Sequence, residues 1–257
     1  MVILSRDEVE RYDRQIMIFG AKGQIKLKEA RVAVFGVGGL GSVSSTYLAA
    51  LGVGELILVD HGRVELSNLN RQILYKTSDI GKFKAEIAAK RLKELNPSVN
   101  VKYFIEEINE RNVYRFVGEA DLIIDGLDNW KTRFLVNKAC VELNKPFIHA
   151  GVHGAYGQLL VVIPGKSPCL QCIIPTIPTG ERKIPILPTT PAVLASLQVT
   201  EAVKIITSYG KPVVGKLILY DGYSMNFHEI PVSRRENCPV CGNFHQKHIS
   251  IPLTKIY

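Results

Sequence analysis

A glycine-rich stretch, GVGGLG at residues 36–41, constrains the fold of this chain more than any other part of its sequence. It stands between a short apolar segment at 31–36 and a run of small residues at 40–52 that has the pattern of a helix. A second apolar segment follows at 55–60 and ends on an acid. In such a unit, glycines let a phosphate approach the backbone, and the acid accepts hydrogen bonds from ribose hydroxyls. We therefore predict a nucleotide site that includes Gly36, Gly38, Gly39, Gly41 and Asp60.

The wider pattern of the chain predicts an α/β fold with a doubly wound, Rossmann-like and mostly parallel sheet. Up to residue 155, the segments with strand character are 31–36, 55–60, 100–108, 121–126 and 146–151. Helical patterns fall among them at 40–52, 84–96 and 133–144. Later segments have the character of antiparallel strands, at 156–163, 216–222 and 225–232.

The second part of the chain also contains a proline-rich segment at 173–191, IIPTIPTGERKIPILPTTP. We expect a long loop there, because prolines remove the N–H donors that helices and sheets require. A helical pattern resumes at 192–210. We expect one domain over 1–257, with a nucleotide-binding half at 8–155, a second half at 156–242 and a tail at 243–257.

Composition narrows the choice of partners and of cell compartment. The N-terminus lacks an apolar region of signal-peptide length, and no stretch approaches 18 uncharged apolar residues, so we expect a cytoplasmic protein without a membrane partner. The net charge of +8 favours an anionic partner. Because the basic residues are dispersed, we expect small-molecule phosphates and an acidic protein rather than nucleic acid.

The loop after Asp60 bears on which nucleotide the site takes. It carries Ser67, Asn68, Arg71 and Gln72, and Lys84 opens the next helical pattern. A site for a dinucleotide such as NAD has no particular need for the two cations Arg71 and Lys84 together. An ATP site does, because the departing pyrophosphate develops negative charge that fixed cations stabilise.

Two carboxylates follow the strand pattern at 121–126, within the sequence DLIIDGLDNW. Asp125 ends the strand, and Asp128 lies beyond it, next to Asn129. Because the carboxyl ends of parallel strands face the ligand crevice, these groups arrive where a Mg²⁺–phosphate complex would sit. Asp128 is the better candidate for the magnesium ligand, while Asp125 is either a second ligand or a local hydrogen-bonding group.

Four of the five cysteines form two pairs, and the fifth, Cys140, stands alone in a helical pattern. Two Cys-x-x-Cys units in a cytosolic chain indicate a closed thiolate zinc site, although a redox pair is the alternative. Cys140 is interpreted as a core residue. The expected zinc ligands are Cys169, Cys172, Cys238 and Cys241.

These motifs together resemble the MoeB/ThiF/HesA family, and most closely its MoeB-type members, over residues 8–242. The resemblance is carried by RYDRQI (11–16), GVGGLG (36–41), SNLNRQ (67–72), Lys84, DGLDNWKTR (125–133), the two Cys-x-x-Cys units and SLQVTEAVK (196–204). It implies an adenylyltransferase that uses ATP and Mg²⁺ to adenylate the C-terminal glycine of a ubiquitin-like sulfur carrier ending in Gly-Gly. The half at 156–242 would then bind the carrier.

The resemblance also implies roles for individual residues. Gly39 and its neighbours would pack against the phosphate and adenosine, and Asp60 would hold the ribose. Arg71 and Lys84 would neutralise the phosphates, and Asp128 would hold Mg²⁺. Arg14 matches a family arginine that reaches the partner subunit's site, which implies a homodimer. The four paired cysteines match the family's structural zinc ligands.

The sequence departs from the family at one position. Many relatives have a cysteine in the loop before the SLQ helix, near Glu181 here, but PTGERKIPILPTTP contains none. We therefore expect adenylation without a thioester at this loop, with sulfur delivered by a separate sulfurtransferase. The carrier and its pathway stay open among molybdopterin, thiamine, tRNA thiolation and protein conjugation. Two other hypotheses are an NAD-dependent oxidoreductase and a non-catalytic zinc-stabilised scaffold.

Overall fold

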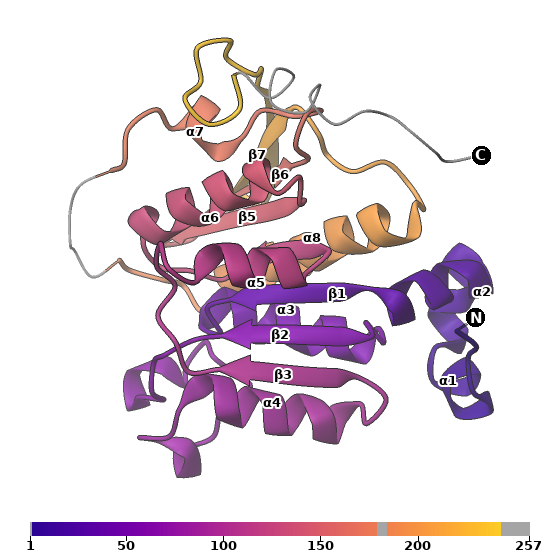
Figure 1. Ribbon diagram of the computed structural model, residues 1–257. Coiled ribbons are helices and arrows are strands. Elements are labelled where there is room, and N and C mark those ends of the chain that lie inside the picture. Colours follow the sequence, from indigo (N-terminus) through magenta and orange to yellow (C-terminus); the bar gives the residue numbers. More distant parts are fainter. Residues whose placement is uncertain (1, 179–183, 243–257) are drawn as a thin grey trace.

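A computed structural model describes residues 2–178 and 184–242 of the chain. Its centre is one sheet of eight strands in the order β3-β2-β1-β4-β5-β6-β7-β8 (Figure 1). The strands are β1 (Arg31–Phe35), β2 (Glu55–Val59), β3 (Asn100–Phe104), β4 (Leu122–Asp125), β5 (Phe147–His153), β6 (Tyr156–Val162), β7 (Lys216–Asp221) and β8 (Asn226–Pro231). Pairing is parallel from β3 through β5 and antiparallel from β5 through β8. The predicted fold class is confirmed.

Burial explains why the parallel strands are apolar runs. Four of the five residues of β1 and of β2, and all four of β4, are buried. A parallel strand covered by helices on both faces has no solvent side, so its sequence lacks alternation. At the far edge, every residue of β8 is exposed.

Helices cover both faces of the sheet. One apolar core joins it to α3 (Gly39–Ala50), α4 (Lys84–Leu95) and α8 (Thr189–Thr207). The other core joins it to α5 (Val113–Glu119), α6 (Trp130–Glu142) and the short α7 (Leu170–Ile173). Helices on both faces of one sheet are what the doubly wound prediction requires.

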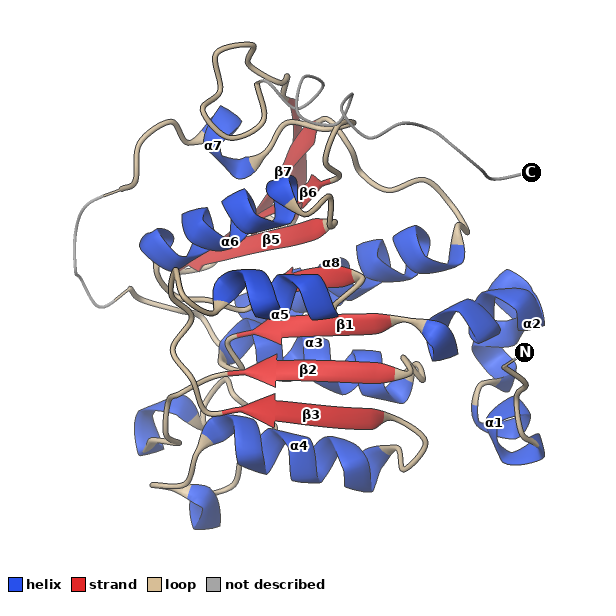
Figure 2. Ribbon diagram, viewed as in Figure 1, coloured by secondary structure: helices blue, strands red, loops and turns tan. Residues whose placement is uncertain are grey.

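The carboxyl ends of β1, β2 and β3 lie at one edge of the sheet (Figure 2). The loop after β1 contacts the loop after β4 there. A Cβ atom built on Gly126 would lie 2.2 Å from the carbonyl oxygen of Gly36, so only glycine allows these two backbones to meet. Gly36 itself has a φ of 83°, which glycine adopts without strain. This contact holds the two loops together at the carboxyl ends of the strands, and Gly36 and Gly126 both line the candidate site there.

Several elements differ from the prediction. No helix was predicted at α1 (Arg6–Arg11) or α2 (Asp13–Glu29), although Ser5 and Glu8 form a capping box that starts α1. The strand expected over 100–108 ends at Phe104, because its partner β2 ends opposite at Val59. The helices α5 and α7 were also not predicted.

The expectation that 173–191 is too proline-rich for regular structure is wrong at three places, the first of which is Ile173, the last residue of α7. Helix α8 begins at Thr189, and Pro191 occupies its first turn, where no N–H donor is needed. Ile186 forms a β-bridge with Gly154. The expected position of a loop cysteine near 181, and the tail at 243–257, lie outside the described residues. Within residues 2–178 and 184–242, no helix has the length and apolar character needed to span a bilayer.

Candidate nucleotide site and cysteine cluster

A cavity of about 700 Å³ opens at the carboxyl edge of the parallel strands. It gathers eleven of the residues predicted for the nucleotide and magnesium site. These are Gly36, Gly38, Gly39, Asp60, Ser67, Asn68, Arg71, Gln72, Lys84, Asp128 and Asn129. They come from four separate stretches of chain, and the sheet topology brings their loops together.

The start of helix α3 forms one wall of this cavity. Gly38 is its N-cap and makes no side-chain cap hydrogen bond, so backbone N–H groups of the first turn are available to an anion. Gly41 does not line the cavity. A Cβ atom on Gly41 would lie 1.8 Å from the carbonyl oxygen of Gly36, so this glycine allows close packing between the loop and α3. Its role is therefore indirect.

Asp60 lies between the glycine loop and the loop after β2. Its Oδ2 accepts a hydrogen bond of 2.7 Å from the N–H of Val37, and its Oδ1 accepts one of 2.7 Å from the N–H of Gly62. The carboxylate is thus fixed beside the cavity by both loops. Each oxygen keeps further lone-pair capacity for a ligand hydroxyl.

Two cationic side chains border the same cavity. Arg71 donates from Nη1 to the carbonyl oxygen of Ser67 and to Oδ1 of Asn70, both at 2.9 Å, which holds its guanidinium on the loop. Lys84 is the first residue of α4 and lies close to Gly62 and Asp60. Among the described residues, neither forms an ion pair with a carboxylate. Their charge is therefore free to act on an anionic ligand.

The side-chain oxygen of Gln72 supports binding of a polar ligand in this cavity. Gln72 is buried, and its Oε1 has no hydrogen-bond partner among the described residues. A buried polar atom without a partner is costly, and a bound group or water would satisfy it.

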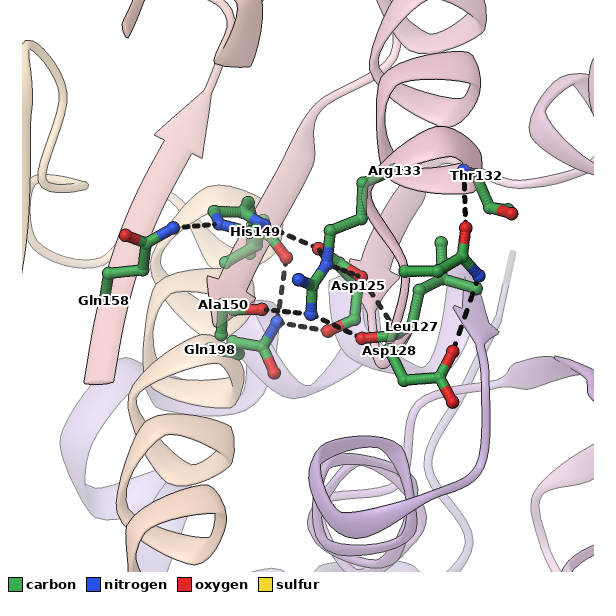
Figure 3. Close-up of polar contacts among 11 residues, drawn as sticks. Asp125, Leu127, Asp128, Thr132, Arg133, His149, Ala150, Gln158 and Gln198 are labelled. Carbon is green, nitrogen blue, oxygen red and sulfur yellow. Dashed lines mark hydrogen bonds and ion pairs between the residues drawn. The ribbon is translucent and has the colours of Figure 1, made fainter. Parts of the chain in front are cut away.

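The two carboxylates at and just beyond the end of β4 have different environments (Figure 3). Asp125 is completely buried and accepts hydrogen bonds from His149 Nδ1 at 2.6 Å and from the N–H of Leu127 at 2.9 Å. It also pairs with Arg133 at 3.1 Å. Asp128 is exposed and lines the cavity. Of the two alternatives for Asp125, the local hydrogen-bonding role matches this geometry.

His149 was missed in the sequence, where six histidines show no metal or triad spacing. It is fully buried in β5, with Gln158 of β6 at 2.8 Å from Nε2 and Asp125 on its other side. Burial is the main cause that lowers the pKa of His149, so the ring is neutral. The sequence did contain one signal that could have identified His149. It is a lone histidine in an apolar strand, next to a strand that ends in an aspartate.

The sequence also did not assign hydrophobic residues to this site. Ile184 and Ile186, from the proline-rich segment, line the cavity together with Pro191 at the start of α8. Ile108 contributes from beyond the end of β3. An apolar wall beside a phosphate-binding loop suits a ligand with an aromatic base.

The four paired cysteines form a separate buried cluster. Their sulfur atoms all lie within 4.8 Å of one another, with Cys169 at 3.7 Å from Cys238 and Cys172 at 3.3 Å from Cys241. Tetrahedral zinc with bonds of about 2.3 Å places its sulfurs about 3.8 Å apart, so the set fits Zn²⁺. None of the four lines the nucleotide cavity. A zinc ion there would join α7 to the segment after β8.

The close approach of the clustered thiols shifts the pKa values of Cys169 and Cys241 in opposite directions. Hydrogen bonding from Cys241 lowers the pKa of Cys169 to about 5, and the same contact raises the pKa of Cys241. Four thiolates this close repel one another unless a cation compensates their charge, and a divalent metal does so. The N–H of Arg235 also points to Cys172 Sγ, at 3.5 Å. Cys140, in contrast, is buried in the apolar core, as expected.

Arg14 is the one predicted site residue that lies away from both the nucleotide cavity and the cysteine cluster. It belongs to α2, its side chain is 93% exposed, and it does not line the cavity. Helix α2 lies at the side of the molecule opposite the carboxyl ends of β1 to β3 (Figure 1). Arg14 therefore does not reach the cavity of its own chain.

Comparison with known proteins agrees with this architecture. The chain is 39% identical over 252 residues to a sulfur carrier protein adenylyltransferase of Thermus thermophilus, with 93% of each chain covered. It is 39% identical to the vegetative HesA protein of Trichormus variabilis, with 98% and 96% covered. The structure of E. coli MccB with MccA-N7isoASN superposes with a TM-score of 0.84 at 29% identity, covering 93% of this chain and 76% of that one.

The sequence model of the ThiF family matches residues 12–240, nearly the whole of the chain. The match and the relatives confirm the predicted family and the predicted enzyme class, an adenylyltransferase. This chain belongs to the ThiF family.

Proposed function

We propose that this protein uses ATP to adenylate the C-terminal glycine of a ubiquitin-like sulfur carrier protein ending in Gly-Gly. The observation that carries the proposal is the cavity in which Asp60, Arg71, Lys84 and Asp128 surround the glycine loop. It is supported by membership of the ThiF family and by the name of the Thermus relative.

In the proposed reaction, a carboxylate oxygen of the carrier attacks the α-phosphorus of ATP. A new oxygen–phosphorus bond forms, the bond from the α-phosphorus to the bridging oxygen breaks, and pyrophosphate leaves with that electron pair. The products are the acyl-adenylate and pyrophosphate. Because the C-terminal carboxylate is already ionised at neutral pH, no general base is needed. Positioning and charge stabilisation supply the rate.

Each residue of the cavity has a distinct proposed role. The amides at Gly38 and Gly39 bind phosphate at the start of α3, and Asp60 holds the ribose. Ser67, Asn68, Gln72 and Asn129 complete the polar wall. Arg71 and Lys84 stabilise the charge that accumulates on the departing pyrophosphate. Asp128, an exposed carboxylate of the cavity, would hold Mg²⁺, which supplies additional positive charge to the phosphates.

The remaining sites organise the assembly. We propose a homodimer in which Arg14 enters the site of the partner subunit, since in its own subunit it is exposed and outside the cavity. Zinc on the four clustered cysteines would hold the last described segment onto α7. The half at 156–242 would bind the carrier, next to the nucleotide half at 8–155.

We further propose that the reaction stops at the acyl-adenylate, and that a separate sulfurtransferase delivers the sulfur. The support is that the proline-rich segment at 173–191 contains no cysteine. The next cysteine after Cys172 in the sequence is Cys238. Without a thiolate, the enzyme has no nucleophile at that loop to form a thioester with the carrier.

Exchange of pyrophosphate into ATP tests the proposal. Wild-type protein, mixed in turn with each ubiquitin-like Gly-Gly protein of the source organism, should catalyse exchange with at least one of them. Asp128→Ala should abolish exchange and keep the zinc content and thermal unfolding of the wild type. If Asp128→Ala exchanges at the wild-type rate, the proposed Mg²⁺ role is wrong. Binding of NADH without any exchange would favour an oxidoreductase instead.

A further inference from the structure

A buried polar cluster borders the cavity, formed by Asp125 at the end of β4, Arg133 in α6 and His149 in β5. Arg133 lines the cavity, while Asp125 and His149 lie behind it. The side chains of Asp125 and His149 are 0% exposed and that of Arg133 is 8% exposed. They form one connected set, because the carboxylate of Asp125 contacts both Arg133, at 3.1 Å, and His149, at 2.6 Å. None of the reaction steps proposed above uses these groups.

The cluster holds the backbone immediately before Asp128. The N–H of Leu127 donates to Oδ1 of Asp125 at 2.9 Å, and the carbonyl oxygen of Leu127 accepts from Arg133 Nη2. Arg133 Nη2 also donates to the carbonyl oxygen of Ala150, at 3.2 Å. Both backbone polar groups of Leu127 are therefore held by buried side chains, and the segment is tied to β5 (Figure 3).

The chain after Asp128 is fixed as well. The side chain of Asn129 accepts a hydrogen bond of 2.9 Å from the N–H of Thr132 and so caps α6. Among residues 2–178 and 184–242, the carboxylate of Asp128 forms one hydrogen bond, which it accepts from Asn129 Nδ2 at 3.4 Å. It thus stands exposed to the cavity on a segment whose two ends are fixed.

His149 contributes to this arrangement through a defined tautomer. Only the amide nitrogen of Gln158 can donate, so the facing Nε2 of His149 is the acceptor. The proton then lies on Nδ1 and is donated to Asp125. With His149 neutral, the carboxylate of Asp125 and the guanidinium of Arg133 leave the cluster with no net charge, which favours its burial.

We propose that Asp125, Arg133 and His149 are positioning residues that hold Asp128 in the orientation needed to bind the Mg²⁺–ATP complex. This inference rests on the proposed magnesium role of Asp128. Groups that orient a metal ligand from behind typically change metal affinity or activity by about 10–100-fold when they are removed. The cluster should therefore affect the dependence of ATP binding on Mg²⁺ more than ATP binding itself.

Binding of ATP at increasing Mg²⁺ concentration measures this effect. It can be followed by calorimetry and by the emission of Trp130, the one tryptophan of the chain, whose ring lies 5.8 Å from that of His149. Arg133→Lys keeps the charge and loses the forked contacts. We expect it to raise the half-saturating Mg²⁺ concentration at least about tenfold. The affinity for ATP measured in EDTA should stay that of the wild type.

Arg31→Lys is the matched control. Arg31 also pairs with an aspartate, Asp121, at 2.8 Å, but at the amino end of β4 and away from the cavity. This variant should keep the wild-type Mg²⁺ dependence. Weaker binding by Arg133→Lys in EDTA as well as in Mg²⁺ would indicate a general folding role, and the proposal would then be wrong.

If Arg133→Lys does not fold, two substitutions of His149 test the positioning role instead. His149→Phe keeps a ring beside Trp130 but removes the donor to Asp125. His149→Asn loses the ring, while its amide nitrogen takes the place of Nδ1. Positioning predicts that His149→Phe requires more Mg²⁺ than His149→Asn. The reverse order would show that His149 acts only by packing.

Asp128→Asn separates this inference from the proposed function. We expect it to require at least about tenfold more Mg²⁺ than the wild type. If Asp128→Asn is impaired while the Arg133 and His149 variants bind as the wild type does, the positioning role fails and the proposed function stands. If Asp128→Asn keeps the wild-type dependence, the proposed magnesium site fails, and the inference fails with it.

Discussion

Gly36 and Gly126 meet backbone to backbone, and a Cβ atom on Gly126 would lie 2.2 Å from the carbonyl oxygen of Gly36. Gly126→Ala should therefore push the glycine loop away from the loop of Asp128. We expect a loss of about 1–3 kcal/mol in the free energy of unfolding and a loss of ATP binding. Urea unfolding and calorimetry measure the two effects.

Gly118→Ala provides the matched control for this substitution. Gly118 lies in α5, and a Cβ atom there would meet no atom within 4 Å. Because alanine favours the helix over glycine, this variant should gain up to about 1 kcal/mol of stability and bind ATP normally. Equal effects of the two substitutions would contradict the close contact between the loops.

Replacement of a clustered cysteine should remove the zinc. Cys238→Ser is expected to lose the metal and to lower the free energy of unfolding by more than about 2 kcal/mol, since binding of a structural metal is coupled to folding. Zinc content by mass spectrometry and thermal unfolding test this. Cys140→Ala, at the buried cysteine outside the cluster, should keep a full zinc content. Full zinc content in Cys238→Ser would show that the four sulfurs are not the ligands.

Mixing of two inactive variants tests the role of Arg14. Arg14→Ala and Asp128→Ala should each lack exchange activity alone, because each removes one part of a site shared by two subunits. After the subunits are exchanged, about a quarter of the sites should have both residues intact and regain activity. No recovery in a mixture that demonstrably forms mixed dimers would place Arg14 outside the partner's site.

The pH dependence of the free energy of unfolding should reveal the lowered pKa of His149 in the folded protein. Burial lowers its pKa in the folded protein, so below about pH 6.5 the unfolded chain binds a proton that the folded chain does not. The free energy of unfolding should then fall with decreasing pH, by at most about 1.4 kcal/mol per pH unit from this group, until the folded-state pKa is reached. The polar groups near the ring are the buried Asp125 and Arg133 and the half-buried Gln158.

His149→Asn removes the titrating group and should flatten this part of the profile. Urea unfolding of both proteins between about pH 7.5 and 5.5, with zinc content checked at each pH, measures the difference. Identical slopes for the two proteins would mean that His149 is protonated in the folded state.

The sequence predicted the parts of this molecule that depend on local patterns. Glycine turns, buried apolar runs and an acid at a strand end are properties of short segments, so the glycine loop and Asp60 were found directly. The other polar residues of the cavity could also be predicted, because a parallel sheet places the loops that follow its strands together at their carboxyl ends. The surroundings of Asp125 were left open, since they depend on Arg133 and His149, which no local spacing connects to it.

Other features required the tertiary structure. The helical start at Thr189 was missed because prolines were treated as breakers wherever they occur, although Pro191 lies in a first turn that tolerates it. Ile184 and Ile186 gave no signal of a site, because apolar residues in a loop have no distinctive pattern. Their place in the cavity wall follows from the bridge between Ile186 and Gly154.

The most direct measurement of the central claim is the intact mass of the carrier after incubation with the enzyme and Mg²⁺–ATP. A panel of ubiquitin-like Gly-Gly proteins should include one that gains an adenylyl group on its C-terminal carboxylate. That group should disappear when pyrophosphate is added, and the enzyme itself should carry no thiol-sensitive adduct. The account would be contradicted if no protein of the panel gained an adenylyl group, or if the carrier became attached to the enzyme through a thioester.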